Sequence, residues 1–342
     1  MNESEKIKFA VVGLGHIGKR HAAMISQNNE CSWVAGCDIL SKEQVKIDNS
    51  QVAYFHSVDD LLGSGTDFDV LSIATPNGLH EEHALKGIKA GKHVVIEKPM
   101  SLTKAGCERI IYEALRHHRQ VFCIMQNRYS PTSVWLKDIL LKGILGKIYM
   151  VQINCYWNRD ARYYTAGNWH GTGALDGGTL FTQFSHFIDI MFWLFGDIKN
   201  ITGRFENFNH KGMIDFEDSG FIQFDFVNGG MGNLSYSTSC WDKNLESSIT
   251  IIAENGMVKV GGQYMNQVDF CHIKDYTMPE LPPANPPNDY GPYKGSAANH
   301  HYIFENVVDV LKGRAPITTN ALEGLKVVEI IERIYSLKRE AV

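Results

Sequence analysis

Apolar runs and helical patterns alternate along the first 126 residues of the chain. Five short apolar runs have the composition of strands buried on both faces, at residues 9–12, 33–37, 70–74, 94–96 and 121–125. Helical patterns lie between them, at residues 17–26, 41–49, 79–90 and 102–117. Strands that alternate with helices favour right-handed crossovers and a parallel sheet. We therefore predict an α/β domain with a doubly wound parallel sheet over residues 1–126, which binds its ligand beyond the carboxyl ends of the strands.

The pattern changes after residue 126 and predicts a second domain over residues 127–342. The expected elements are a helix near 132–142, a strand over 148–157, serial strands between 201 and 273, and two helices near 297–311 and 322–339. Turn signals at residues 228–230 and 254–256 indicate hairpins among the serial strands. We predict an α+β domain with a large, mainly antiparallel open sheet, which binds the substrate and carries oligomerisation.

Three glycines follow the first apolar run in the spacing G-x-G-x-x-G, and a helical pattern begins near His16. In such a Rossmann motif Gly13 makes the tight turn, Gly15 lets the backbone approach a pyrophosphate, and Gly18 lets the helix sit close to the sheet. The N-terminus of the helix offers N–H groups and a positive dipole end to the phosphates. Asp38 lies twenty residues after Gly18 and can accept hydrogen bonds from ribose hydroxyls.

Asp38 also indicates which dinucleotide is bound. Its carboxylate would repel a 2′-phosphate, and Ile39 and Leu40 put no arginine beside it. We therefore expect NAD rather than NADP as the cofactor. The alternative is a glycine-rich turn that binds no ligand.

Two other strand ends carry polar residues. Thr75, Pro76 and Asn77 follow the third apolar run, and Asn77 has the alternative role of capping the next helix. Glu97 and Lys98 follow the fourth run, where the alternative is a surface ion pair worth little energetically. We favour a functional role for Lys98, because a partly buried lysine shifts its pKa readily and can transfer a proton.

A polar stripe interrupts an otherwise apolar helical pattern at residues 179–195, which ends before Gly196. Thr182, His186 and Asp189 are spaced i, i+4 and i+7, with Gln183 beside them. Buried polar groups cost free energy unless they find partners in the protein, in water or in a ligand. The alternative is a core histidine held by Asp189, but the predicted cofactor cleft favours a catalytic His186.

Lys98 and His186 together suggest the chemistry of a dehydrogenase, with one residue in each domain. Such an enzyme removes a hydride from carbon, which NAD accepts, and a proton from the adjoining hydroxyl. We expect both side chains to converge on the hydroxyl beside the nicotinamide. We favour His186 as the base and Lys98 as its electrostatic partner, although the sequence leaves the two roles open.

Composition excludes several other classes of function. The chain has 342 residues, a net charge of −5 and 44% hydrophobic residues, which is typical of a two-domain globular protein without a nucleic-acid surface. No apolar stretch reaches membrane-spanning length, and the N-terminus lacks the apolar segment of a signal peptide. The seven cysteines include no C-x-x-C pair, which favours free thiols in a reducing compartment. We expect a cytoplasmic protein with no metal site, no membrane contact and no nucleic-acid partner.

Taken together, these motifs resemble the glucose-fructose oxidoreductase/inositol dehydrogenase (Gfo/Idh/MocA) family. The resemblance rests on the glycine motif, Thr75-Pro76-Asn77 with His80, Glu97-Lys98-Pro99 and a histidine on a second-domain helix. Within the family, the stretches at residues 127–131, 156–169 and 175–186 look like those of the UDP-N-acetylglucosaminuronic acid 3-dehydrogenases. Those enzymes oxidise the sugar C3 hydroxyl to a ketone, for the sugars of bacterial surface polysaccharides.

The resemblance implies a set of site residues, with catalysis by Lys98 and His186. Cofactor contacts are expected at Gly13, Gly15, His16, Ile17, Gly18, Asp38, Ile39, Thr75, Pro76, Asn77, His80, Glu97, Lys98 and Arg128. Substrate contacts are expected at Lys98, Arg159, Tyr163, Tyr164, Thr182, Gln183, His186, Tyr293 and Asn299. The resemblance also implies a sheet-mediated homodimer or homotetramer. Some relatives hold NADH tightly and reoxidise it with a keto acid such as 2-oxoglutarate.

Two departures from the family pattern bear on the substrate. Polyol-oxidising relatives carry an aspartate where this chain has Thr182, and nucleotide-sugar relatives usually carry an arginine where it has His170. Arg159 is a candidate for binding an anionic substrate, whereas Tyr163 and Tyr164 suit either stacking on a ligand or packing in the core. Besides the nucleotide-sugar dehydrogenase, two alternatives stay open: an NAD-dependent dehydrogenase of a free sugar or polyol, and a non-catalytic NAD-binding sensor.

Overall fold

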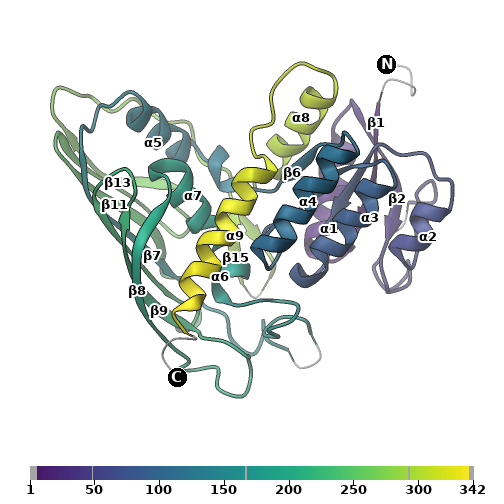
Figure 1. Ribbon diagram of the computed structural model, residues 1–342, viewed down its shortest axis with the longest axis horizontal. Coiled ribbons are helices and arrows are strands. Elements are labelled where there is room, and N and C mark those ends of the chain that lie inside the picture. Colours follow the sequence, from purple (N-terminus) through teal and green to yellow (C-terminus); the bar gives the residue numbers. More distant parts are fainter. Residues whose placement is uncertain (1–5, 48, 166–167, 292, 339–342) are drawn as a thin grey trace. The chain divides into compact units, whose positions relative to one another are not determined.

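The computed structural model describes residues 6–47, 49–165, 168–291 and 293–338, and it divides into two compact units. The first comprises Met1–Met125 with His300–Val328, and the second Gln126–Asn299 with Glu329–Val342 (Figure 1). The sequence assigned all of residues 127–342 to one domain, whereas contacts group residues 300–328 with the first unit. The first five residues, which bear on the signal-peptide expectation, and residue 339, the expected end of the last helix, lie outside the described residues.

The first unit contains a six-stranded parallel sheet in the order β3-β2-β1-β4-β5-β6. Its strands are β1 (Ile7–Val12), β2 (Cys31–Cys37), β3 (Ala53–Phe55), β4 (Val70–Ile73), β5 (His93–Ile96) and β6 (Val121–Cys123). Its helices are α1 (His16–Gln27), α2 (Val58–Gly63), η2 (Asn77–Leu79), α3 (His80–Lys89), α4 (Lys104–Arg116) and α8 (His300–Leu311). The strand order reverses beside β1, so the predicted doubly wound fold is confirmed and β1 and β4 flank the switch point.

The expectation of a helix over residues 41–49 is wrong. Residues 42–46 form turns, β3 and α2 follow, and residue 48 lies outside the described residues. Only Val45 is fully buried among residues 41–47, so no apolar face would dock such a helix. Lys46 has a φ of +56°, in the left-handed region, which interrupts helical backbone.

The close approach of α1 to the end of β1 depends on glycine. Gly13 has a φ of +82°, and a Cβ there would lie 2.6 Å from the carbonyl oxygen of Ala74. A Cβ on Gly18 would lie 1.7 Å from the carbonyl oxygen of Gly13. A Cβ on Gly15 would meet nothing within 4 Å. The tight turn at Gly13, the open backbone at Gly15 and the close packing at Gly18 therefore each match the role expected from the motif.

The second unit is built on a seven-stranded sheet in the order β13-β12-β11-β7-β10-β9-β8, in which only the described pair β7 and β10 is parallel. Its strands are β7 (Ile148–Tyr156), β8 (Ile198–Glu206), β9 (Ser219–Phe226), β10 (Met231–Ser237), β11 (Glu246–Ala253), β12 (Gly256–Gly261) and β13 (Gln267–Ile273). A small pair, β14 (Pro287–Asp289) and β15 (Lys294–Ala297), accompanies this sheet. The mainly antiparallel sheet agrees with the prediction.

Helices pack on one face of this sheet (Figure 1). They are η3 (Gln126–Tyr129), α5 (Pro131–Leu141), α6 (Thr179–Thr182), α7 (Ser185–Phe195) and α9 (Ala321–Ser336), the last of which continues from the first unit. Trp157, at the end of β7, packs edge-on against Phe184 and Phe187 in the core between helices and sheet. This packing buries the face of α7 that the apolar pattern predicted.

The single helix expected over residues 179–195 is two helices instead, although α7 does end at Gly196, whose φ is +88°. The backbone N–H groups of Gln183 and Phe184 both donate to the carbonyl of Thr179. The second of these bonds spans five residues rather than four, so the backbone widens between α6 and α7 in the manner of a π-bulge. Thr182 and His186 therefore lie on different helices, which the i, i+4 spacing alone could not indicate.

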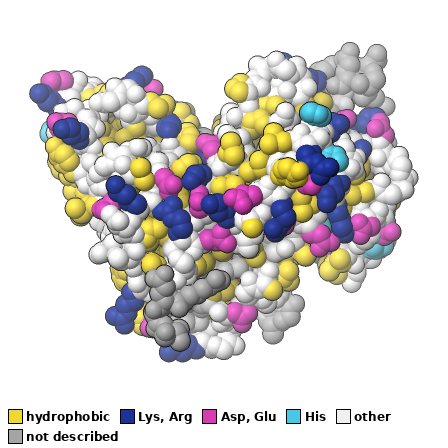
Figure 2. All heavy atoms as spheres, viewed as in Figure 1, with side chains coloured by type: hydrophobic (Ala, Val, Ile, Leu, Met, Phe, Trp, Pro, Cys, Tyr) yellow, Lys and Arg dark blue, Asp and Glu magenta, His cyan; other side chains and the backbone are white. Residues whose placement is uncertain are grey.

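The surface carries charges of both signs. Figure 2 shows Lys and Arg side chains interspersed with Asp and Glu over the face that it draws. Among the described residues, no helix is both long enough and apolar enough to cross a membrane.

We expect Gly18→Ala and Gly15→Ala to differ in their effect on stability. The Cβ of Gly18→Ala meets backbone, so its overpacking should cost about 1–3 kcal/mol, which outweighs the gain of up to about 1 kcal/mol in helix propensity. The Cβ of Gly15→Ala enters open space, so we expect a loss below about 1 kcal/mol from the weaker N-cap. Chemical denaturation of both variants tests this, and equal losses would contradict the assigned packing role of Gly18.

Candidate active site

The glycine turn and α1 have the features of a pyrophosphate site. Gly15 is the N-cap of α1, and because it is a glycine it has no side chain that could cap the helix. Gly15 and His16 are both exposed. The first turn of α1 contains no acidic residue. The backbone at this helix N-terminus is thus accessible to an anion, as the motif predicted.

Asp38 is held at the end of β2 by two backbone donors. Its Oδ2 accepts a hydrogen bond from the N–H of Leu14 at 2.6 Å, and its Oδ1 accepts one from the N–H of Leu40 at 2.9 Å. Each carboxylate oxygen can accept more than one hydrogen bond, so both can also accept from ribose hydroxyls. The neighbouring Ile39 is 88% exposed and contributes no positive charge for a 2′-phosphate. These residues fit NAD.

His80 and Asn77 follow β4 and are both buried, and their expected contacts with the cofactor stay predictions. Both ring nitrogens of His80 face backbone carbonyls: Nδ1 lies 2.7 Å from the oxygen of Pro99 and Nε2 lies 2.8 Å from that of Thr75. Burial lowers the pKa of His80, an effect that these carbonyls oppose. The ring therefore lies between the segments that follow β4 and β5, and in its neutral form its single N–H donates to one of the two carbonyls. Asn77 is buried in η2, and the N-cap of α3 is Leu79, so Asn77 does not cap that helix as its alternative role required.

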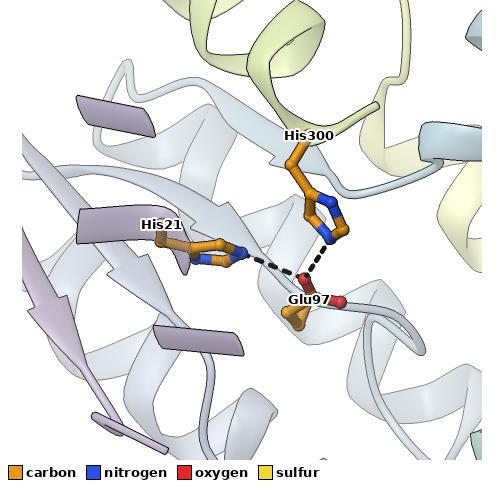
Figure 3. A group of neighbouring side chains, drawn as sticks. All are labelled: His21, Glu97 and His300. Atoms are coloured by element: carbon orange, nitrogen blue, oxygen red, sulfur yellow. Dashed lines mark hydrogen bonds and ion pairs between the residues drawn. The ribbon is translucent and has the colours of Figure 1, made fainter. Parts of the chain in front are cut away.

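Glu97 lies in a buried cluster with two histidines (Figure 3). Its Oε1 lies 3.0 Å from Nε2 of His21 and 3.4 Å from Nε2 of His300, and its Oε2 accepts a hydrogen bond from the backbone N–H of Lys98 at 3.1 Å. Burial raises the pKa of Glu97, but the contacts with the two histidines outweigh it and hold this pKa well below its usual value. Glu97 is therefore an ionised carboxylate beneath the half-buried Lys98.

The polar stripe of α7 pairs with η3, which follows β6 along the chain. The amide Nε2 of Gln126 lies 3.3 Å from Nε2 of His186. An amide nitrogen can only donate, so this histidine nitrogen accepts and carries no proton. Three residues further along α7, Asp189 forms a buried ion pair with Arg128, whose Nε and Nη2 both donate to the carboxylate. Arg128, expected at the cofactor, is thus engaged with α7.

Thr182 is hydrogen-bonded to Asp176, a buried carboxylate that was not among the predicted site residues. Its hydroxyl donates to the side chain and to the backbone carbonyl of Asp176, which is itself buried. The other carboxylate oxygen of Asp176 accepts a hydrogen bond from the N–H of Gly171 at 2.8 Å. Asp176 thus occupies the neighbourhood in which polyol-oxidising relatives have an aspartate at the position of Thr182. Only its place before the glycine pair at residues 177–178 marked it in the sequence.

Arg159 is the centre of a buried polar and aromatic group. Its Nε donates to Oε1 of Gln183 at 2.9 Å, whose amide in turn donates to the hydroxyl of Tyr163 at 2.7 Å. Its guanidinium lies 5.3 Å from the ring centroid of Tyr163 and 5.0 Å from that of Tyr293, and Nη2 donates to the carbonyl of Lys294. The structure thus brings together four of the predicted substrate residues. Most N–H groups of Arg159 already have protein acceptors, so binding of an anion by Arg159 stays a prediction.

Tyr164 and Asn299 support the residues around them. Tyr164 is buried and packs edge-on against Tyr163 at 4.9 Å. Asn299 donates through Nδ2 to the carbonyl of Gln126 and to the hydroxyl of Ser130. Asn299 therefore holds η3 in place. Because Gln126 on η3 contacts His186, Asn299 also helps to position that contact.

Gln126 and Asn127 are further site candidates. Both side chains are buried, and among the described residues Oε1 of Gln126 and both amide atoms of Asn127 make no hydrogen bond. Buried polar atoms without a partner are costly, so these atoms mark a place where water or a polar ligand would supply the missing partner. The signal for them was the polar run that begins where the fifth predicted strand ends.

Comparison with known proteins identifies the family and the fold. The Gfo/Idh/MocA oxidoreductase family model for the NAD-binding Rossmann fold matches residues 7–125, and the model for the family's C-terminal domain matches residues 134–259. The structure is similar to that of the WlbA dehydrogenase from Bordetella pertussis in complex with NADH and UDP-GlcNAcA, with 31% sequence identity, a TM-score of 0.86 and coverage of 98% of both chains. WlbA from Chromobacterium violaceum, in complex with the same two ligands, is 29% identical with a TM-score of 0.87, over 100% of this chain and 96% of that one.

Curated relatives match over shorter stretches. An inositol 2-dehydrogenase from Salmonella paratyphi B is 27% identical over 196 residues, which are 56% of this chain and 55% of the relative. The matched region spans about half the length of several such relatives. The two family models together nevertheless cover more than half of the chain, and the fold has both of the domains that they describe. The chain belongs to the Gfo/Idh/MocA family of oxidoreductases, whose N-terminal domain is an NAD-binding Rossmann fold.

Proposed function

We propose that this protein is an NAD-dependent dehydrogenase that oxidises a secondary hydroxyl of a sugar, and that its substrate is UDP-N-acetylglucosaminuronic acid, oxidised at C3. The proposal rests on two side chains that can transfer a proton, Lys98 after β5 and His186 on α7. Each lies beside buried hydrogen-bonded groups: the backbone N–H of Lys98 donates to Glu97, and His186 contacts Gln126. Similarity to a structure that holds NADH and UDP-GlcNAcA, over nearly the full chain, supports this substrate.

NAD would be held by three parts of the first unit. The turn at Gly13 and Gly15 and the N-terminus of α1 suit the pyrophosphate, and Asp38 suits the ribose of the adenosine. When bound, NAD accepts the hydride that leaves the substrate carbon. The chain itself must then remove the hydroxyl proton.

His186 is the proposed base. Its Nε2 faces the amide of Gln126 and is the nitrogen with the basic lone pair, so the substrate hydroxyl would have to replace Gln126 as the partner of this nitrogen before it gives up its proton. Lys98 would stabilise the negative charge that develops on the substrate oxygen. Arg128, Gln126 and Asn299 would hold His186 and η3 in position.

Substrate contacts are proposed along the group that Arg159 organises. Tyr163, Gln183 and Tyr293 are connected to Arg159 by hydrogen bonds or ring contacts. Burial raises the pKa of Tyr163 well above its usual value, so its hydroxyl stays protonated. We further propose that Thr182 and Tyr164 line the same substrate site.

A second candidate function is oxidation of a free sugar or polyol. Asp176 favours this second function. Polyol-oxidising relatives carry an aspartate at the position of Thr182, and in this chain the hydroxyl of Thr182 donates to the buried carboxylate of Asp176. Asp176 would therefore supply the carboxylate that those relatives have at position 182. The nucleotide-sugar proposal and this alternative differ in substrate and share the same cofactor and base.

A single-turnover substrate panel distinguishes these candidates. We expect enzyme mixed with NAD and UDP-N-acetylglucosaminuronic acid to form one NADH per active site, together with a sugar product lighter by two hydrogens in mass spectrometry. Inositol, glucose and their phosphates should give far less NADH. A larger kcat/KM with inositol would contradict the proposal. Repetition with 2-oxoglutarate present tests whether bound NADH is recycled.

Substitution of the two proposed catalytic residues should slow the chemical step selectively. Lys98→Met and His186→Asn should each lower kcat by about 10²–10⁴-fold, because a positioned acid or base contributes that much, while NADH still binds. Ile188→Val is the matched control: Ile188 is buried on the same helix, α7, and its side chain carries no polar atom, so kcat should stay near normal. Near-normal turnover in both catalytic variants would refute the assignment.

We also propose that the protein forms a homodimer or homotetramer through its large sheet. On the sheet face opposite α7, four exposed side chains form a row across adjacent strands. They are Met231, Met150, Ile252 and Met257, exposed by 56%, 47%, 40% and 42% and paired in register across β10, β7, β11 and β12. Exposed apolar rows of this kind mark association surfaces.

Charge introduced into this row should disrupt association. We expect the wild type to be oligomeric in light scattering after gel filtration, and Met231→Glu to shift it toward the monomer mass. Leu115→Glu provides the control, since Leu115 is 72% exposed but lies on α4 in the other unit. A wild type that is monomeric at all accessible concentrations would rule the proposal out.

A further inference from the structure

The buried polar groups near residues 97–99 converge on one short backbone segment. We infer that His21, His80, Glu97 and His300 form a positioning group, the Lys98 cradle, which holds the backbone on both sides of Lys98. This inference rests on the proposed function, because that function gives Lys98 its part in the chemistry. It adds positioning residues to the same site.

Glu97 holds the segment from the N-terminal side of Lys98. Its Oε2 accepts the hydrogen bond from the backbone N–H of Lys98, while its Oε1 faces His21 and His300 (Figure 3). Both carboxylate oxygens are therefore engaged, and the carboxylate cannot rotate without losing contacts. By fixing Glu97, the two histidines fix the peptide that carries Lys98.

His80 holds the segment from the C-terminal side. Its Nδ1 lies 2.7 Å from the carbonyl oxygen of Pro99, directly after Lys98, and its Nε2 lies 2.8 Å from that of Thr75. The ring therefore lies between the backbone after β5 and the backbone after β4, and in its neutral form its single N–H donates to one of these two carbonyls. In a doubly wound sheet these strand ends line the ligand crevice, so the cradle acts on the part of the fold that faces the reaction.

The buried polar side chains of the cradle cost more free energy than an apolar core of the same volume would. His21 and His80 are fully buried, and Glu97 and His300 are 6% and 1% exposed. Buried ionic and polar groups usually stabilise a fold less than apolar side chains of similar volume. The cradle draws on α1, α3, β5 and α8, yet two of its contacts end on the backbone of residues 98 and 99. Positioning of Lys98 accounts for polar groups that stability alone would not favour.

A metal ion is the competing interpretation of the same cluster. Ligand atoms of His21, Glu97 and His300 lie within 4.8 Å of one another, and two histidines with a carboxylate can bind zinc or iron. The distances favour hydrogen bonding, because 3.0 Å between His21 Nε2 and Glu97 Oε1 is an ordinary N–H···O contact. Nδ1 of His21 lies 2.9 Å from the hydroxyl of Ser72, which can donate to it while Nε2 carries the proton. Both interactions are satisfied without a metal.

Competitive acetylation of lysines over a range of pH tests the cradle directly. The full-length protein with NADH bound is labelled, and Lys98 is quantified by peptide mass spectrometry. In Glu97→Gln, which keeps the shape but removes the charge, the labelling profile of Lys98 should change, because the carboxylate that accepts from its backbone N–H and faces His21 is lost. The kcat for the sugar nucleotide should fall about 10–100-fold, the usual effect of losing a supporting residue, with little change in KM for NAD.

Two further comparisons separate positioning from stability. Nε2 of His300 lies 3.4 Å from Oε1 of Glu97 without a hydrogen bond of good geometry among the described residues, so His300 contributes a polar group beside the carboxylate. His300→Gln keeps a polar side chain there and should recover most of the activity that His300→Ala loses. His93→Gln is the control, because His93 begins the same strand but its Nδ1 accepts from the backbone N–H of Gln120 instead. It should leave Lys98 labelling and kcat unchanged.

The outcomes are distinct. Wild-type labelling and kcat in both Glu97→Gln and His300→Ala would overturn the inference, as would losses that follow only the unfolded fraction. One equivalent of zinc or iron in the purified wild type, lost in His300→Ala, would replace it with a metal site. Labelling needs no substrate, so the expected change in Lys98 labelling without any oxidation of the sugar nucleotide would refute the proposed function and leave the cradle intact.

Discussion

Buried polar groups must be hydrogen-bonded, and this constraint shapes both units of the protein. In the first unit it joins Glu97 to His21 and to the backbone of Lys98. In the second it joins the polar stripe of α7 to η3 through His186 and Asp189. Each network costs free energy unless it is complete, and each surrounds one residue with proton-transfer chemistry. The amide of Asn127 has no hydrogen-bond partner among the described residues, so the same requirement calls for water or a polar ligand at this place.

The cofactor half depends on a second constraint, the distance between helix and strand. Gly18 allows α1 to approach the turn at Gly13, and this approach brings the helix N-terminus to the strand ends. The carboxylate of Asp38 is bonded to the N–H of Leu14 inside that turn, so phosphate and ribose recognition share one rigid element. A dinucleotide therefore meets a prepared backbone surface rather than flexible side chains.

Much of the fold was predictable because buried faces of strands and helices place apolar residues at regular spacings in the sequence. Alternating apolar runs and helical patterns predicted the parallel sheet, and the glycine motif predicted its functional end. The helix predicted over residues 41–49 does not form, because this segment has helical propensity but no buried apolar face that would pack against the sheet. The break between α6 and α7 was invisible because a widened turn at Phe184 leaves no change in hydrophobic period.

The sequence singles out candidate site residues, whereas their contacts come only from the structure. Lys98 and His186 were marked by their positions, one at a strand end and one on a buried helix. Arg128 and His80 were expected at the cofactor, yet the structure pairs them with Asp189 and with two backbone carbonyls. Such pairings join residues that are remote in sequence, and no local pattern encodes them. Asp176 was missed for the same reason, because only folding brings its carboxylate to Thr182.

We propose that the protein transfers the hydride from C3 of a sugar nucleotide to NAD. The most direct measurement uses UDP-N-acetylglucosaminuronic acid carrying deuterium only at C3, with isotope analysis of the reduced cofactor after one turnover. The account predicts that the deuterium appears in the reduced nicotinamide. Reduced cofactor free of deuterium, or label retained in the oxidised sugar, would contradict it.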